Sequence, residues 1–127
     1  MLSTCLRSLV AIACVSISST LLAVEAKDLE GSYTVKGVEP DGGKYEGTCE
    51  ITHTARHSVQ LVWKFGKKRS IGQGKLENDV LTVEYEGAIA DREGRAVYDV
   101  KSKDRLVGEW KRKGTKGTGK ETLTRDK

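Results

Sequence analysis

The sequence predicts an all-β protein, an antiparallel up-and-down barrel of about eight strands. From Leu29 onward, apolar side chains recur at every second position, which is the period of a strand with one buried face. Short segments rich in Gly, Asn and Asp separate the runs and cannot hold the helix of a parallel crossover. Glycines also fall inside the runs, where a missing side chain permits the bending that closes a sheet. A two-sheet sandwich has the same period and stays open as the alternative.

Eight alternating runs follow one another along the chain, each predicted to form one strand. Their marker residues are, in order, Tyr33 and Val35; Tyr45, Cys49 and Ile51; Val59, Leu61, Trp63 and Phe65; Ile71 with Gly72 and Gly74; Leu81, Val83 and Tyr85; Ala96, Tyr98 and Val100; Leu106 and Trp110; and Leu123. The predicted turns are residues 39–43, 54–58, 66–69, 77–79, 91–94, 102–104 and 113–117. No amphipathic helix is expected.

Residues 1–26 have the layout of a secretory signal peptide. Arg7 precedes an apolar run that ends at Val24, and Ala26 supplies the small residue at which a leader peptidase cuts. We expect cleavage after Ala26, which leaves residues 27–127 as one small domain. The protein is then secreted or periplasmic and has no stable membrane span. An uncleaved membrane anchor is the alternative.

Cleavage would remove Cys5 and Cys14 and leave Cys49 as the one cysteine of the domain. No intrachain disulfide is then available, and we expect Cys49 to be buried. Cys49 and His53 share a strand face but lie about 13 Å apart, too far to hold one ion without a bend. With His57 in a turn, no metal site is expected.

The motifs of the chain resemble those of a group of short exported bacterial proteins, some of which carry an automatic fibronectin-binding label. The resemblance rests on Gly31-Ser-Tyr33-Thr-Val35-x-Gly37, Tyr45-x-Gly47, Gly72-x-Gly74, Leu106-x-Gly108-x-Trp110 and Gly117-x-Gly119-x-Glu121-x-Leu123. It covers nearly all of residues 27–127 and implies a fold rather than an activity. Asp104-Arg105 departs from the Asp-Gly turn of that pattern. The layout is more distantly similar to avidin and lipocalin barrels, which implies architecture alone.

Five residues are predicted to line a ligand site inside the barrel: Trp63, Tyr85, Tyr98, Trp110 and Glu121. Alternation puts Glu121 on the same face as Leu123, toward the interior. A buried carboxylate needs a partner, and Arg95 or Arg105 is expected to supply it. Glu121 is then either one side of an ion pair at the barrel rim or the anchor of a ligand. The rings either fill the core or form a cavity for a small apolar ligand.

Two basic clusters are predicted on the surface, on a chain whose formal net charge is +4. They are Lys67, Lys68 and Arg69, and Lys111, Arg112 and Lys113. On an exported protein they suit an extracellular protein or an anionic polymer. Nucleic acid is not expected as a partner outside the cytoplasm. Solvated hairpin tips without a binding role are the alternative.

No residue pattern predicts catalysis or a cofactor. The segment 114–120 nearly completes a phosphate-binding loop, but Glu121 stands where Ser or Thr would hold magnesium. The sequence therefore predicts a non-catalytic binding module that contacts extracellular macromolecules through its basic hairpins. The alternative is a carrier of a small apolar ligand inside a lipocalin-like or avidin-like barrel.

Overall fold

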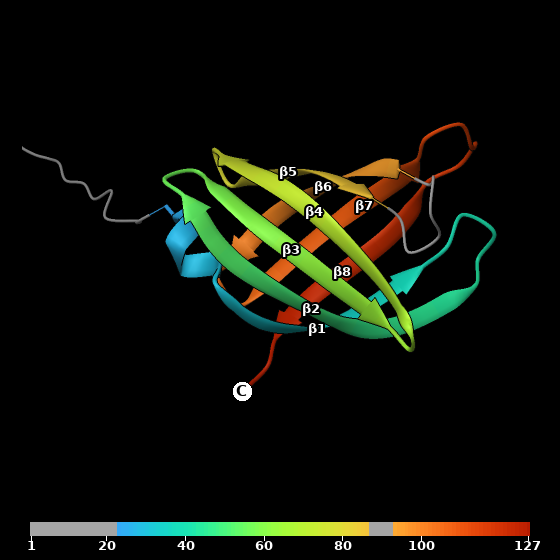
Figure 1. Ribbon diagram of the computed structural model, residues 1–127, viewed down its shortest axis with the longest axis horizontal. Helices are drawn as coiled ribbons and strands as arrows, with labels where there is room; N and C mark the ends of the chain where they lie inside the picture. Colours follow the sequence, from blue (N-terminus) through green and yellow to red (C-terminus); the bar gives the residue numbers. More distant parts are fainter. Residues whose placement is uncertain (1–22, 87–92) are drawn as a thin grey trace, which may run out of the picture.

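Eight antiparallel strands close into a barrel in the computed structural model, which describes residues 23–86 and 93–127 (Figure 1). Each strand pairs with its neighbours in sequence, and β1 pairs with β8 to complete the ring. The elements are η2 (Ala26–Leu29), β1 (Gly31–Val38), β2 (Lys44–Ala55), β3 (Ser58–Phe65), β4 (Lys68–Glu77), β5 (Val80–Glu86), β6 (Glu93–Ser102), β7 (Arg105–Arg112) and β8 (Gly119–Arg125). The predicted barrel is confirmed, and the sandwich alternative is wrong because the sheet has no free edge.

Alternation along each strand places one face in the barrel interior. In β7, for example, Leu106, Gly108 and Trp110 are buried while Arg105 and Glu109 are exposed. Aliphatic and aromatic side chains meet inside and form one continuous core. Its members are Ala26, Leu29, Tyr33, Val35, Cys49, Ile51, Val59, Leu61, Trp63, Leu76, Leu81, Val83, Ala96, Tyr98, Val100, Leu106, Trp110 and Leu123.

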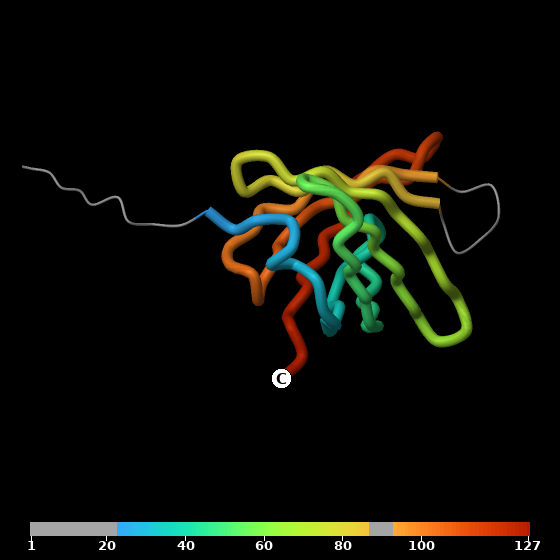
Figure 2. The backbone as a smooth tube through the Cα atoms, turned by 60° about the vertical axis from the view of Figure 1, so that its left-hand side comes forward, coloured from blue at the N-terminus to red at the C-terminus, as the bar shows by residue number. Residues whose placement is uncertain are grey.

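The short 3-10 helix η2 closes one end of the barrel, which we call the plugged end. It is blue in Figure 2 and lies across the barrel end, packed against β2 and β3. Leu29 is fully buried there, and its carbonyl accepts a 2.7 Å hydrogen bond from the Tyr33 hydroxyl. This helix was not predicted, because four residues give no helical period.

Arg125 fastens the plugged end. Its guanidinium donates to the carbonyls of Asp28 at 2.7 Å and Glu30 at 2.8 Å, and to the Tyr33 hydroxyl at 2.8 Å. The guanidinium carbon lies 4.9 Å from the centre of the Tyr33 ring, within range of a cation–π contact. One side chain thus ties η2 to β1 and β8.

The opposite end, the loop end, is formed by residues 39–43, 66–67 and 113–118, and the adjoining ends of β5 and β6 also lie there. The predicted turn 91–94 is corrected in part: Glu93 and Gly94 belong to β6, and residues 91 and 92 lie outside the described residues.

Most of the predicted signal peptide, residues 1–22, also lies outside the described residues. Ala26, the predicted cleavage position, is buried inside η2, and the Glu25 backbone N–H donates to the Asp28 carboxylate at 3.0 Å. Among residues 23–86 and 93–127, no helix has the length and apolar character to span a membrane.

Candidate functional site

Glu121 occupies the centre of a row of residues that crosses five strands inside the barrel. The register pairs Gly37 with Tyr45, Gly37 with Glu121, Gly108 with Glu121, and Gly108 with Tyr98. The row therefore reads Tyr45, Gly37, Glu121, Gly108, Tyr98. A glycine flanks the carboxylate on each side, and a tyrosine lies beyond each glycine.

The two glycines let the tyrosine rings lie across the neighbouring strands. A Cβ atom on Gly108 would approach the Tyr98 Cδ1 atom to 2.6 Å and would also collide with the Val97 carbonyl oxygen. A Cβ atom on Gly37 would collide with the Tyr45 ring. Because both positions lack a side chain, both hydroxyls reach Glu121.

Four aromatic side chains build the hydrogen-bond network around the Glu121 carboxylate. Tyr45 donates to Oε1 at 2.7 Å, Trp63 Nε1 donates to Oε2 at 3.1 Å, and the Tyr98 hydroxyl also donates to Oε2. Trp110 Nε1 donates to the Tyr45 hydroxyl at 2.8 Å. We call these five residues the Glu121 network. Every donor proton is directed at the carboxylate, directly or through Tyr45.

Burial sets the protonation behaviour of the network. Desolvation raises the pKa of Glu121 above its usual value of 4.5, and the hydrogen bonds from Tyr98, Tyr45 and Trp63 oppose that rise. Desolvation and the nearby carboxylate also raise the pKa of Tyr45 and of Tyr98. No cation forms an ion pair with Glu121 among the described residues. The network therefore holds a carboxyl group by neutral donors alone.

Aromatic rings continue from the Glu121 network to the loop end. Tyr45 meets the ring of Phe65 edge-on at 5.4 Å between centroids and the ring of Trp110 at 6.3 Å. Trp63 meets Tyr85 at 5.9 Å. Tyr45, Phe65 and Tyr85 are only half-buried, whereas large inward side chains nearer the plugged end are buried. We call these three rings, with Trp110, the aromatic mouth.

Arg112 lies at the rim of the aromatic mouth. Its guanidinium carbon is 4.9 Å from the centre of the Trp110 ring, and its Nη2 atom is 3.3 Å from the Glu39 carboxylate. Tyr85 extends across Gly94 toward this position, since the register pairs Gly94 with both Tyr85 and Arg112. Desolvation raises the pKa of Tyr85 to about 12, and the charge of Arg112 opposes that rise. Arg112 was predicted on the outer surface; the structure places it half-buried against the mouth.

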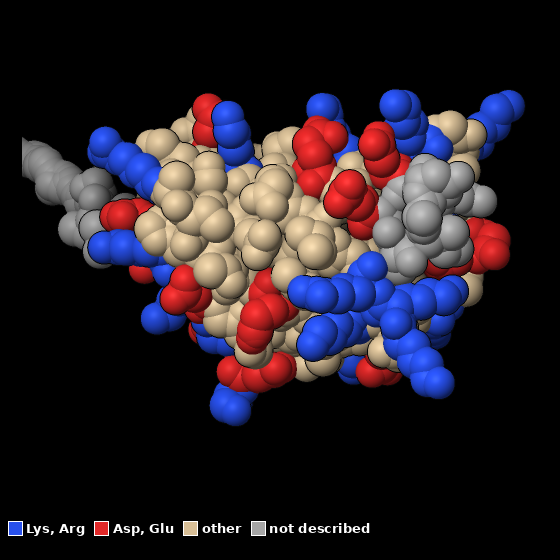
Figure 3. All heavy atoms as spheres, viewed as in Figure 1, with Lys and Arg blue, Asp and Glu red and all other residues tan. Residues whose placement is uncertain are grey.

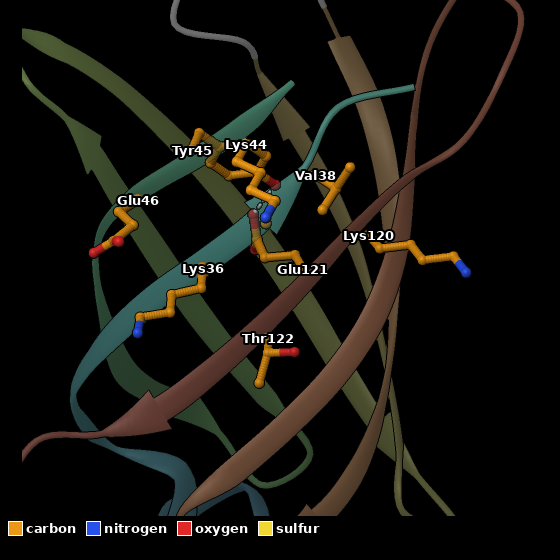
Figure 4. Close-up of a pocket in the computed structure, with 9 residues that line it drawn as sticks. Lys36, Val38, Lys44, Tyr45, Glu46, Lys120, Glu121 and Thr122 are labelled. Atoms are coloured by element: carbon orange, nitrogen blue, oxygen red, sulfur yellow. Dashed lines mark hydrogen bonds between the residues drawn. The ribbon is translucent and has the colours of Figure 1, made fainter. Parts of the chain in front are cut away.

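A shallow pocket of about 260 Å³ opens on the outer wall where β1, β2 and β8 meet (Figure 4). Gly37, Tyr45 and Glu121 contribute to its lining, and Figure 4 shows Tyr45 and Glu121 directed toward one another beneath it. Lys36 and Lys120 extend away from these two side chains. The Glu121 network thus comes close to the outer surface at Gly37, where the strand has no side chain to cover it.

The two predicted basic clusters lie at the loop end but differ in their pairing. Lys111 and Arg112 end β7 and Lys113 follows it; Arg112 faces Glu39, and Lys113 Nζ is 3.7 Å from Glu93. Lys67, Lys68 and Arg69 form the tip and the first residues of the β3–β4 hairpin and make no ion pair with another described residue. Figure 3 shows cationic side chains gathered where this hairpin ends.

The structure joins four of the five predicted interior residues in one network. Trp63, Tyr98 and Trp110 gather around Glu121, and Tyr85 contacts Trp63. Tyr45 was missing from the predicted site, although it alternates in register with Cys49 and Ile51.

The expected arginine partners of Glu121 are wrong. Arg95 pairs with Glu84 at 2.6 Å on the outer face, and Arg105 is exposed. Both residues occupy outward positions in their strands, so neither side chain reaches the interior. Cys49 is buried, as expected, and burial raises the pKa of its thiol. Within the described segments, no three potential metal ligands come together.

No protein-family model and no curated protein sequence matches the chain. Among solved structures, a redesigned β-barrel is similar with a TM-score of 0.72 at 14% identity, covering 80% of this chain and 95% of that one. A de novo designed fluorescence-activating β-barrel has a TM-score of 0.69 at 15% identity and covers 82% of this chain and 100% of its own. A third, the redesigned barrel mFAP1 bound to DFHBI, has a TM-score of 0.68 at 15% identity, over 79% and 97% of the two chains.

At these identities the likeness shows the fold alone. It agrees with the closed barrel of the structure and gives no support to the expected family of exported bacterial proteins or to a fibronectin-binding label.

Proposed function

We propose that this protein binds a small, largely apolar ligand at the loop end of its barrel, without catalysing a reaction. The observation that carries the proposal is the difference between the barrel ends. Toward the plugged end the inward side chains are buried beneath η2, whereas Tyr45, Phe65 and Tyr85 are only partly buried at the other end. Aromatic rings above a few convergent polar groups are typical of a small-molecule site.

The Glu121 network supports the proposal. Burying a carboxyl group without a cation opposes folding, and a core built for stability alone has no need of one. Here it lies beneath the aromatic mouth and is linked to it through Tyr45 and Trp110. The barrel of mFAP1, which has a similar fold, is bound to DFHBI. Export of the protein stays part of the proposal and is supported by the sequence of residues 1–26.

Titration with N-phenyl-1-naphthylamine, an uncharged aromatic probe, tests this function. The chain has two tryptophans, Trp63 and Trp110, and both belong to the Glu121 network. A probe in the mouth should therefore quench Trp emission in a saturable manner, with one probe per chain. Phe65→Ser or Tyr85→Ser should weaken binding about tenfold or more, through loss of ring contact.

The matched control is Val97→Ser, because Val97 is a large apolar residue that is 41% exposed on the outer face of β6. This variant should bind the probe as the parent does, and circular dichroism should show all variants folded. Absence of saturable binding, or equal weakening by Val97→Ser, would exclude the aromatic mouth as the site.

A second candidate function is the binding of an anionic polymer by the β3–β4 hairpin. It is favoured by the absence of ion pairs at Lys67, Lys68 and Arg69 within the described residues, which leaves these charges available to a partner. Replacing all three by Gln should reduce retention on immobilised heparin more than replacing Lys111 and Lys113. Equal elution of the two variants would count against the hairpin, as would retention that does not respond to salt.

A further inference from the structure

Two arginines continue the inward rows of their strands, one at each end of the barrel. Arg112 follows Leu106, Gly108 and Trp110 in β7, and Arg125 follows Gly119, Glu121 and Leu123 in β8. Both are less exposed than the outward residues beside them. The hydrogen-bond partners of the inward guanidinium group can therefore be compared directly between the two ends of the barrel.

Arg125 has a structural role that uses all three guanidinium nitrogens. Nε donates to the Asp104 carboxylate at 2.9 Å, Nη1 to the Glu30 carbonyl, and Nη2 to the carbonyls of Asp28 and Lys103 and the Tyr33 hydroxyl. A guanidinium carries five N–H donors, and this set of acceptors leaves little capacity for a ligand. The plugged end is therefore closed to an anion.

Arg112 uses little of its hydrogen-bonding capacity on the residues that the structure describes. Within the described residues its guanidinium makes one side-chain hydrogen bond, from Nη2 to Glu39 at 3.3 Å. Both partners are more than a third exposed, so this ion pair is weak and exchanges readily with another anion. A planar guanidinium with unused donors suits the bidentate binding of a carboxylate, sulfonate or phosphate group.

The position of Arg112 defines how such a ligand would lie. Its guanidinium rests against Trp110, with Tyr85 reaching toward it across Gly94, so the charge stands beside apolar rings. Glu121 pairs with Gly108, four residues earlier in β7, which places its position about 13 Å deeper along the strand. An anionic group at Arg112 therefore avoids the carboxylate, while the rings of the same ligand pack against the aromatic mouth.

We propose that the ligand of the aromatic mouth is an aromatic molecule carrying an anionic group, and that Arg112 binds this group in place of Glu39. The inference rests on the proposed function and adds the charge of the ligand and the residue that selects it. Lys67, Lys68 and Arg69 lie at the same end of the barrel and raise the local concentration of anions there.

Two probes that share one ring system test the inference on the full chain. N-phenyl-1-naphthylamine is uncharged, and 8-anilinonaphthalene-1-sulfonate has the same ring skeleton with an added sulfonate group. The protein should bind the sulfonated probe at least tenfold more tightly than the uncharged probe. Arg112→Gln should remove this preference while the Kd for the uncharged probe stays within about twofold.

Arg95→Gln is the control, because it removes one positive charge that is paired with Glu84 on the outer face. It should preserve the preference for the sulfonate. Equal affinity for the two probes, or a preference that survives Arg112→Gln, would overturn the inference and leave the proposed function standing. Failure of the uncharged probe to bind the folded protein would overturn the proposed function and this inference with it.

Discussion

Replacing Tyr98 by Phe is expected to destabilise the barrel by an amount that depends on pH. The substitution keeps the buried ring and removes one hydroxyl, whose proton is donated to Glu121 Oε2. A hydrogen bond to a charged group contributes about 1.5–3 kcal/mol, and one between neutral groups about 0.5–1.5 kcal/mol. The cost should therefore be about 1 kcal/mol when Glu121 is protonated and about 2 kcal/mol or more when it is ionised.

The direction follows from the raised pKa of Glu121. Because the folded pKa lies above the usual 4.5, the native state holds a proton that the unfolded chain has released between these two values. The stability from this proton is fully present below pH 4.5 and is lost as the pH rises through the folded pKa. Loss of the Tyr98 hydroxyl raises that pKa further, so the variant should lose more stability than the parent over this interval.

Urea unfolding of parent and variant at about pH 4 and pH 8 measures the effect. Tyr85→Phe is the matched control, because the Tyr85 hydroxyl donates a long 3.4 Å bond to the Lys111 carbonyl and touches no carboxylate of the network. Its cost should be below about 1 kcal/mol and equal at both pH values. If the cost of Tyr98→Phe is the same at both pH values, the Tyr98 hydroxyl does not stabilise the ionised form of Glu121, and the reasoning is refuted.

Three further expectations concern other parts of the barrel. Gly108→Ala should lower the unfolding free energy by about 1–3 kcal/mol in thermal melts, because its Cβ displaces the Tyr98 ring. In the Gly108→Ala background, Tyr98→Phe should then have no pH-dependent cost. Gly43→Ala is the control: its Cβ meets only the Asp41 carboxylate at 3.2 Å, and it should change stability by less than about 0.5 kcal/mol. Arg125→Lys should cost about 2 kcal/mol, since an ammonium cannot reach all the acceptors around η2, whereas the exposed Arg105→Lys should leave the melting temperature unchanged. The buried Cys49 thiol, with its raised pKa, should react with a disulfide reagent at pH 8 at least 100-fold more slowly in the native protein than in urea, and rapid reaction of the folded protein would contradict its burial.

The alternation of side chains was enough to predict the fold and the depth of most residues. It placed Glu121 inside because Leu123 lies two residues later on a strand with one apolar face. It also identified Trp63, Tyr98 and Trp110 as interior rings. These predictions depend only on the period of a strand, which is a local property of the chain.

The partners of Glu121 could not be predicted from that period. Tyr98 is 23 residues away in sequence and Tyr45 is 76, and the stagger of the strands around the barrel brings them together. Arg95 and Arg105 were expected to pair with Glu121 because of their charge alone, but both occupy outward positions in their strands. Arg112 shows the opposite error: the run Lys111, Arg112, Lys113 indicated a surface cluster, although alternation from Trp110 already points Arg112 inward.

The contrast between the two barrel ends argues that the loop end was shaped by something other than folding. At the plugged end, the hydrogen-bonding groups of Arg125 and Tyr33 are used by acceptors within the barrel, and Leu29 is fully buried. At the loop end, three rings are only partly buried, and among the described residues the inward Arg112 guanidinium has one side-chain partner, the carboxylate of Glu39. A sequence able to saturate one end could have closed the other with the same residue types. This difference between the two ends is the main structural support for the proposed ligand at the aromatic mouth.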